Sequence, residues 1–158
     1  MRHGVCVAAA VALVVGVSGT ACGGPDSGTA PEATSPSSAT VAVLDDSLLP
    51  SLVPTPANSQ GTQGPDGIAD NGIHLHFVVN GSPGDVMASY RAALQDKGWE
   101  VTTIVTSGGE GGGGATYTGT NGAAYGVFDG GGFNTTTYID VCAWPTKPAE
   151  PNCTRGDR

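Results

Sequence analysis

Two histidines separated by one residue, His74 and His76, are the side chains best suited to bind a metal ion. Residues at this spacing in an extended strand point to the same face. A zinc or copper site needs at least one more ligand, for which Glu100 or Asp140 is available on predicted strands. The chain has no HExxH motif. We therefore expect two solvated histidines and no resident metal or other cofactor, and keep His74 and His76 as candidate ligands.

Asp129 and Asp140 form a second candidate pair, since two nearby carboxylates can share general acid–base work. Both residues lie toward the ends of predicted strands, where acidic side chains are usually solvated. We therefore assign no catalytic residue. The chain also lacks GxSxG, SxxK and P-loop motifs. A dispersed Ser-His-Asp triad stays open as an alternative, because its members need not be close in sequence.

A glycine-rich run at residues 109–114 matches the spacing of the dinucleotide-binding string GxGxxG. Such a site requires a strand before the glycines and a helix after them, whose N-terminus holds the pyrophosphate. Here an Ala-Thr-Tyr-Thr run follows, which is typical of a strand. We interpret residues 107–114 as a flexible hairpin loop.

Five of the aromatic side chains in the second half of the chain form a candidate binding set. Their rings can line a groove that stacks against a glycan or a lipid, or can belong to the core and the sheet surface. The five are Tyr117, Tyr125, Phe133, Tyr138 and Trp144.

The clearest structural unit that could position these residues is a strand, a helix and a second strand. Residues 73–79 and 99–105 alternate between apolar and polar side chains, which predicts half-buried strands. Between them, Ser82 and Pro83 suit the start of a helix and Gly98 suits its end. This connection should be right-handed and place the two strands parallel in one sheet. The apolar stripe of the helix consists of Val86, Tyr90 and Leu94, widened by Met87 and Ala93.

The folded domain is expected to begin at Val41, where apolar residues become frequent. A polar stretch over residues 54–72 either contains a short strand near Ile68 or serves binding. The predicted fold class is α+β, with one long helix packed on a mixed, mostly antiparallel sheet of about five strands, one before the helix and the others after it. The face opposite the helix should be solvated. The remaining strands are predicted at residues 115–120, 123–129 and 135–143, the first two joined by an Asn-Gly hairpin turn.

The four cysteines of the chain divide by position. Cys6 lies in an N-terminal leader. Cys142 and Cys153 are expected to form a disulfide that holds the chain end on the last strand, leaving residues 154–158 as a flexible tail. Cys22 is then the odd cysteine, and a free thiol is a liability in an oxidising compartment.

The N-terminus has the features of a secretory signal peptide. A basic start precedes a 13-residue apolar run, which is too short to span a hydrocarbon core of about 30 Å. The stretch Gly19-Thr20-Ala21-Cys22 resembles a bacterial lipoprotein processing site (lipobox), and it also suits ordinary signal peptidase. The lipobox resemblance implies cleavage before Cys22, diacylglycerol on its sulfur and acylation of the new amino group.

Residues 23–40 have alanines as their only apolar side chains and cannot bury enough surface to offset the entropy of ordering. We therefore expect a disordered tether there. The predicted layout is a lipoprotein signal peptide at 1–21, the lipidated cysteine and tether at 22–40, the α+β domain at 41–153 and the flexible tail at 154–158.

The formal net charge of the chain is −8. An acidic surface argues against binding of nucleic acid and against electrostatic docking on anionic lipid headgroups. Attachment to the membrane therefore falls to the lipid on Cys22. The expected location is the extracytoplasmic face of the plasma membrane.

The stretch from Tyr90 to Trp99 has the pattern YRxxLxxxGW. With Cys22 and the tether, it resembles small actinobacterial, mycobacterial-type lipoproteins of the cell envelope. The resemblance implies packing and capping roles for these residues and no catalytic role. The leading hypothesis is a non-catalytic binding or accessory module, with an envelope protein or a cell-wall component as partner. The alternatives are an enzyme acting on envelope glycans or lipids, and a metal carrier through His74 and His76.

Overall fold

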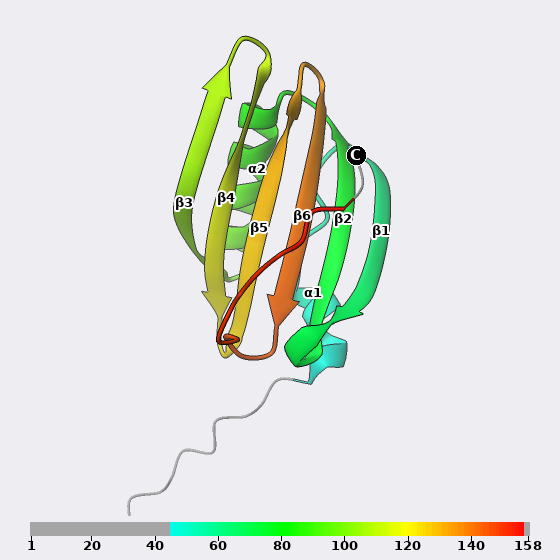
Figure 1. Cartoon of the computed structure of the whole chain (residues 1–158), viewed down its shortest axis with the longest axis vertical. Coiled ribbons are helices and arrows are strands. Elements are labelled where there is room, and N and C mark those ends of the chain that lie inside the picture. Colours follow the sequence, from blue (N-terminus) through cyan, green and yellow to red (C-terminus); the bar gives the residue numbers. More distant parts are fainter. Residues whose placement is uncertain (1–44, 157–158) are drawn as a thin grey trace, which may run out of the picture. The chain divides into compact units, whose positions relative to one another are not determined.

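The computed structural model describes residues 45–156, which form a single six-stranded sheet with a helix on one face (Figure 1). The spatial order of the strands is β1-β2-β6-β5-β4-β3, and every neighbouring pair is antiparallel. The strands are β1 (Ser59–Ile68), β2 (Gly72–Asn80), β3 (Glu100–Gly109), β4 (Gly112–Asn121), β5 (Ala124–Phe133) and β6 (Thr136–Trp144). The helices are α1 (Leu49–Leu52) and α2 (Pro83–Asp96), with 3-10 turns η1 (Asp46–Leu48) and η2 (Ala69–Asn71).

The helix-on-sheet arrangement agrees with the predicted α+β class, but two of its details were wrong. The sheet is wholly antiparallel rather than mixed. The domain also has two helices instead of one long one, because the four-residue helix α1 precedes the 14-residue helix α2. The connection from β2 through α2 to β3 does leave these two strands running in the same direction. They are not neighbours, however, because β6, β5 and β4 fill the space between them.

The polar stretch at 54–72 was predicted either to contain a short strand near Ile68 or to serve binding, and the structure places the strand β1 there. It is ten residues long and mostly exposed, so its sequence has no alternation of buried and exposed side chains. Its backbone pairs with β2, with register shifts on either side of a central segment. A proline, Pro65, fits here because an edge strand leaves one row of backbone groups unpaired.

The main core lies between α2 and the sheet. Met87, Tyr90 and Leu94 of α2 are buried, as the apolar stripe predicted. The ring of Phe128 is fully buried at the centre, with its centroid 5.0 Å from that of Trp99 and 6.3 Å from that of Tyr90. Edge-on packing of this kind is favourable for aromatic rings. The Trp99 indole donates to the carbonyl oxygen of Leu52 (2.8 Å), which attaches α1 to this core.

The helix α2 lies between Ser82 and Gly98, as predicted, but the hydrogen bond at its N-terminus differs from the expected one. Ser82 has extended backbone angles, but its hydroxyl donates to the Asp85 carboxylate (2.6 Å) instead of accepting from the helix backbone. Gly98 takes φ +90°, a conformation that glycine adopts without strain, and it ends the helix as expected.

The sheet face opposite α2 was predicted to be solvated, and over β5 and β6 this was wrong. The C-terminal segment, red in Figure 1, runs across these strands on that face. A disulfide joins Cys153 of this segment to Cys142 of β6, as predicted. Closing a loop of this size contributes about 3 kcal/mol on the chain-entropy account. A second apolar cluster forms beneath the segment, from Tyr125, Val127, Cys142 and Trp144 with Ile68 and Cys153.

Several predictions fall on residues 1–44 and 157–158, outside the described residues. They are the leader at 1–21, the modification of Cys22, the tether and the start of the domain at Val41. Within residues 45–156, no helix is both long and apolar enough to cross a membrane.

Candidate functional site

A row of side chains crosses the middle of the sheet on the face opposite α2. The strand register sets His76 opposite Asp140, Asp140 opposite Asp129, and Asp129 opposite Thr116. Directly opposed residues of neighbouring strands point to the same face and lie close together. The four residues therefore bring an imidazole, two carboxylates and a hydroxyl together, from four different strands.

Asp140 is the fully buried centre of this row. Its Oδ1 lies 2.8 Å from Nδ1 of His76, 3.2 Å from Nε2 of His74 and 2.8 Å from the backbone nitrogen of Gly156, which donates to it. Its Oδ2 is also buried and has no hydrogen-bond partner among residues 45–156. A carboxylate is stable in the interior only when it is hydrogen-bonded or paired. Here the two histidines and the backbone of Gly156 supply those partners.

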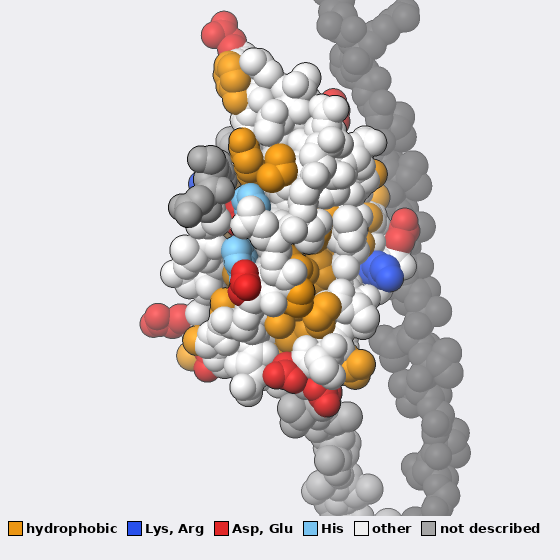
Figure 2. Space-filling model, turned by 90° about the vertical axis from the view of Figure 1, so that its right-hand side faces the viewer, with side chains coloured by type: hydrophobic (Ala, Val, Ile, Leu, Met, Phe, Trp, Pro, Cys, Tyr) orange, Lys and Arg blue, Asp and Glu red, His pale blue; other side chains and the backbone are white. Residues whose placement is uncertain are grey.

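The two histidines were predicted to be solvated, and for His76 this was wrong. Its side chain is only 4% exposed and stacks on the ring of Tyr138, with centroids 6.0 Å apart. His74 is half-buried. Figure 2 shows histidine side chains at the surface on the β1 side of the molecule, next to acidic ones. Of the two proposed third ligands, Asp140 contacts both histidines, whereas Glu100 begins the opposite edge strand β3.

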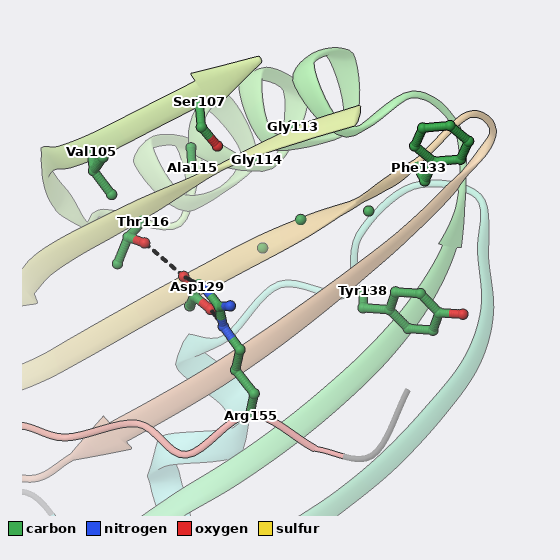
Figure 3. A pocket seen from close by; sticks show the side chains of 13 residues that line it. Val105, Ser107, Gly113, Gly114, Ala115, Thr116, Asp129, Phe133, Tyr138 and Arg155 are labelled. Carbon is green, nitrogen blue, oxygen red and sulfur yellow. Dashed lines mark hydrogen bonds and ion pairs between the residues drawn. The ribbon is translucent and has the colours of Figure 1, made fainter. Parts of the chain in front are cut away.

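Asp129 holds the chain end through a two-pronged ion pair. The guanidinium of Arg155 donates from Nη2 to Oδ1 (3.1 Å) and from Nε to Oδ2, and the Thr116 hydroxyl donates to Oδ1 (2.6 Å) (Figure 3). The hydrogen bond to Asp129, and then its charge, raise the pKa of Arg155. Such forked pairs fix orientation as well as charge. Asp129 and Asp140 are thus buried mid-strand residues, not the solvated strand-end residues that the sequence predicted.

The described part of the predicted flexible tail, residues 154–156, is bound to the sheet. Arg155 contacts Asp129 and Gly156 contacts Asp140. The disulfide at Cys153 brings these residues to the sheet, and the two buried carboxylates supply their partners. The sequence contains one signal that this segment is attached to the sheet: Cys153 lies two residues before Arg155.

A groove of about 470 Å³ lies beside this network, between β3 and the chain end (Figure 3). Its volume is within the range of small-molecule sites. Asp129 and Arg155 line it together with Ser107 and Thr116. The rings of Phe133, which is 62% exposed, and Tyr138 complete its wall. Two of the five aromatic residues singled out from the sequence, Phe133 and Tyr138, therefore line the groove. The other three are buried in the two apolar clusters of the domain, and they are Tyr117, Tyr125 and Trp144.

The rest of the groove lining is mostly glycine backbone, from residues 113–114 and 130–132. The predicted flexible loop at 107–114 is instead the paired end of the β3–β4 hairpin. Side chains do not fit at two of the glycines that line the groove. A Cβ on Gly114 would lie 2.2 Å from the carbonyl oxygen of Gly130, and a Cβ on Gly132 would lie 2.0 Å from the carbonyl oxygen of Thr136. The glycines therefore allow close approach of strands, and within the described residues no helix follows them that could hold a pyrophosphate.

One group of possible metal ligands comes together among residues 45–156. The ligand atoms of His74, Cys142 and Cys153 all lie within 4.8 Å of one another. His76 is not part of this group, although it shares a face with His74. The sulfur atoms are joined in the disulfide and are therefore not thiolates in this state.

Fold and site together define an antiparallel α+β domain in which the segment up to residue 156 is bound across one sheet face, beside a polar groove. Comparison with protein-family models, with curated proteins and with solved structures gives no match to this chain.

Proposed function

We propose that the protein is a lipid-anchored, non-catalytic binding module on the extracytoplasmic face of the plasma membrane, and that the groove beside Asp129 holds its ligand. The leader and Cys22 support the anchor, as does the resemblance to envelope lipoproteins. The Cys142–Cys153 disulfide supports the location, because such bonds persist in oxidising compartments.

The state of the polar groups in the groove favours binding over catalysis. A general acid or base has to exchange a proton with its substrate. Both oxygens of Asp129 are already engaged by Arg155, and one of them also by Thr116. In residues 45–156, no serine or threonine hydroxyl is hydrogen-bonded to a histidine, as a nucleophile–base pair would require. The engagement of both Asp129 oxygens is the observation that carries the proposal.

The lining favours a neutral, hydroxylated ligand such as a segment of cell-wall glycan. Hydroxyl groups of Ser107 and Thr116 and the exposed donors of Arg155, whose side chain is 58% exposed, can exchange hydrogen bonds with sugar hydroxyls. The exposed ring of Phe133 offers an apolar surface to a sugar face. The net charge of −8 disfavours polyanionic ligands.

We expect Phe133→Ala to weaken co-sedimentation of the full mature protein with purified cell-wall material by about tenfold, the effect of removing about 1.4 kcal/mol. Leu48→Ala is the matched control, because Leu48 is a similarly exposed apolar residue (51%) that lies outside the groove lining. Equal binding by both variants would contradict the groove as the binding site. Release of soluble sugar by the wild type, lost in Asp129→Asn, would support the enzyme alternative instead.

The anchor has a separate test. We expect Cys22→Ala to move the protein from the detergent phase to the aqueous phase after Triton X-114 partition, because the lipid is the proposed means of attachment. Mass spectrometry of the wild-type N-terminus supplies the second measurement. An unmodified Cys22 thiol, or a Cys22→Ala protein that stays in the detergent phase, would rule out the anchor without bearing on the groove.

A further inference from the structure

The disulfide and His74 together contain a complete set of zinc-type ligand atoms. An imidazole nitrogen and two cysteine sulfurs lie within 4.8 Å of one another, and this set, with a fourth position left to water, is one that Zn²⁺ takes in proteins. The strand register accounts for the proximity, since His74 of β2 lies directly opposite Cys142 of β6. Cys153 then reaches the same place through the C-terminal segment.

We propose that reduction of the Cys142–Cys153 disulfide converts this cluster into a Zn²⁺ site formed by two thiolates and the imidazole of His74. The step requires an external thiol or phosphine reductant, which supplies two electrons and is itself oxidised, while two protons from the medium or the thiols complete the two cysteine thiols. Binding of Zn²⁺ to the thiols then releases two protons. The metal replaces the S–S bond as the link between β6 and the C-terminal segment.

The surroundings of His74 are those of a metal-ligating histidine. Its Nε2 lies 3.2 Å from Oδ1 of Asp140, which leaves Nδ1 for the metal in this proposal. A carboxylate on the non-ligating nitrogen of an imidazole orients the ring and raises its basicity. The second oxygen of that carboxylate is buried and has no hydrogen-bond partner among residues 45–156. A partly compensated anion next to the cluster favours the approach of a cation.

A cavity of about 320 Å³ gives access to the cluster. It is lined by His74 and Cys142, which are two of the three ligands, and by the carboxylates of Asp70 and Glu150. A proposed metal site needs such an entry path, and a coordinating water needs space. Cys153 is itself half-buried and not fully enclosed. The site is separate from the groove at Asp129 and does not depend on the proposed glycan ligand.

The test compares oxidised and reduced protein under exclusion of oxygen. The full chain carries Cys6→Ser and Cys22→Ser, so that the remaining thiols are those of the site. After reduction with a phosphine, we expect one tightly held zinc ion per chain, and none in the oxidised protein. Cobalt should give thiolate-to-metal charge-transfer absorption and the d–d bands of tetrahedral coordination, in the reduced state alone.

Two variants separate His74 from its neighbour on the same strand. We expect His74→Gln to weaken zinc binding by more than tenfold, and His76→Gln to change it by less than threefold, because His76 also contacts Asp140 but is not a ligand. The proposal is overturned if oxidised and reduced protein bind zinc equally, or if His74→Gln binds like the wild type. It is also overturned if the zinc-loaded reduced protein lacks the circular dichroism of the native sheet, since the metal would then be held by an unfolded chain.

Discussion

Asp140→Ala is expected to lower the free energy of unfolding by about 3–5 kcal/mol, the usual cost of leaving a buried charged or polar network without one partner. Asp140 is fully buried and its Oδ1 meets His76, His74 and the Gly156 backbone nitrogen. Removing the carboxylate leaves the buried ring nitrogen of His76 and the backbone N–H of Gly156 without their hydrogen-bond partner.

Asp140→Asn is the matched control for this prediction. The amide has the same shape and keeps one acceptor oxygen for His76, so we expect a smaller loss of about 1–3 kcal/mol. Urea denaturation followed by circular dichroism measures both variants. Equal losses for Asn and Ala would show that the negative charge, and not the acceptor geometry, holds the network. A loss below about 1 kcal/mol for Ala would contradict the structural role of Asp140.

Phe128→Ala is expected to cost about 3–5 kcal/mol, the range for truncating a fully buried aromatic residue. The ring lies between Trp99 and Tyr90. It also covers Gly126, where a Cβ would come within 2.5 Å of the ring. A residue so enclosed from several sides leaves a cavity that the surrounding strands cannot close. The free energy of unfolding in urea, with an unchanged m-value, is the measurement.

Tyr90→Phe tests the same cluster without making a cavity. The Tyr90 hydroxyl is buried and has no hydrogen-bond partner among residues 45–156, and burial raises its pKa, so the group is neutral at physiological pH. Removing an unpaired buried hydroxyl leaves no orphaned partner, and we expect a change within about 1 kcal/mol, toward higher stability if any. A large loss of stability would show that the hydroxyl has a partner after all.

Elements with strong local signals were predicted well from the sequence. The strand predicted at residues 73–79 is β2, and the helix between Ser82 and Gly98 is α2. In both, a buried face imposes a period on the side chains that can be read from one short segment. The strand β1 lacks that period because its side chains are mostly exposed, so what defines it is backbone pairing with β2, which leaves no pattern in its own residues.

The candidate site was predicted residue by residue but not as an arrangement. The types and spacing of four residues mark them as candidates, namely His74, His76, Asp129 and Asp140. Their burial was not foreseen, because it comes from the C-terminal segment that lies over them. Arg155 belongs to the predicted flexible tail. The nearby Cys153 indicates attachment to β6, but no residue close to Arg155 in the sequence indicates that its partner is Asp129, 26 positions earlier in the chain.

The sequence by itself determined β2 and α2, whose buried faces leave a period in their residues, and the pairing of Cys142 with Cys153. Only the tertiary structure decided which of those residues meet. Periodicity states to which side a residue points, but it contains no information on strand order or register, and both depend on contacts between distant segments. For that reason His74 has a sulfur pair and a buried carboxylate beside it, where its own segment indicated only an exposed histidine.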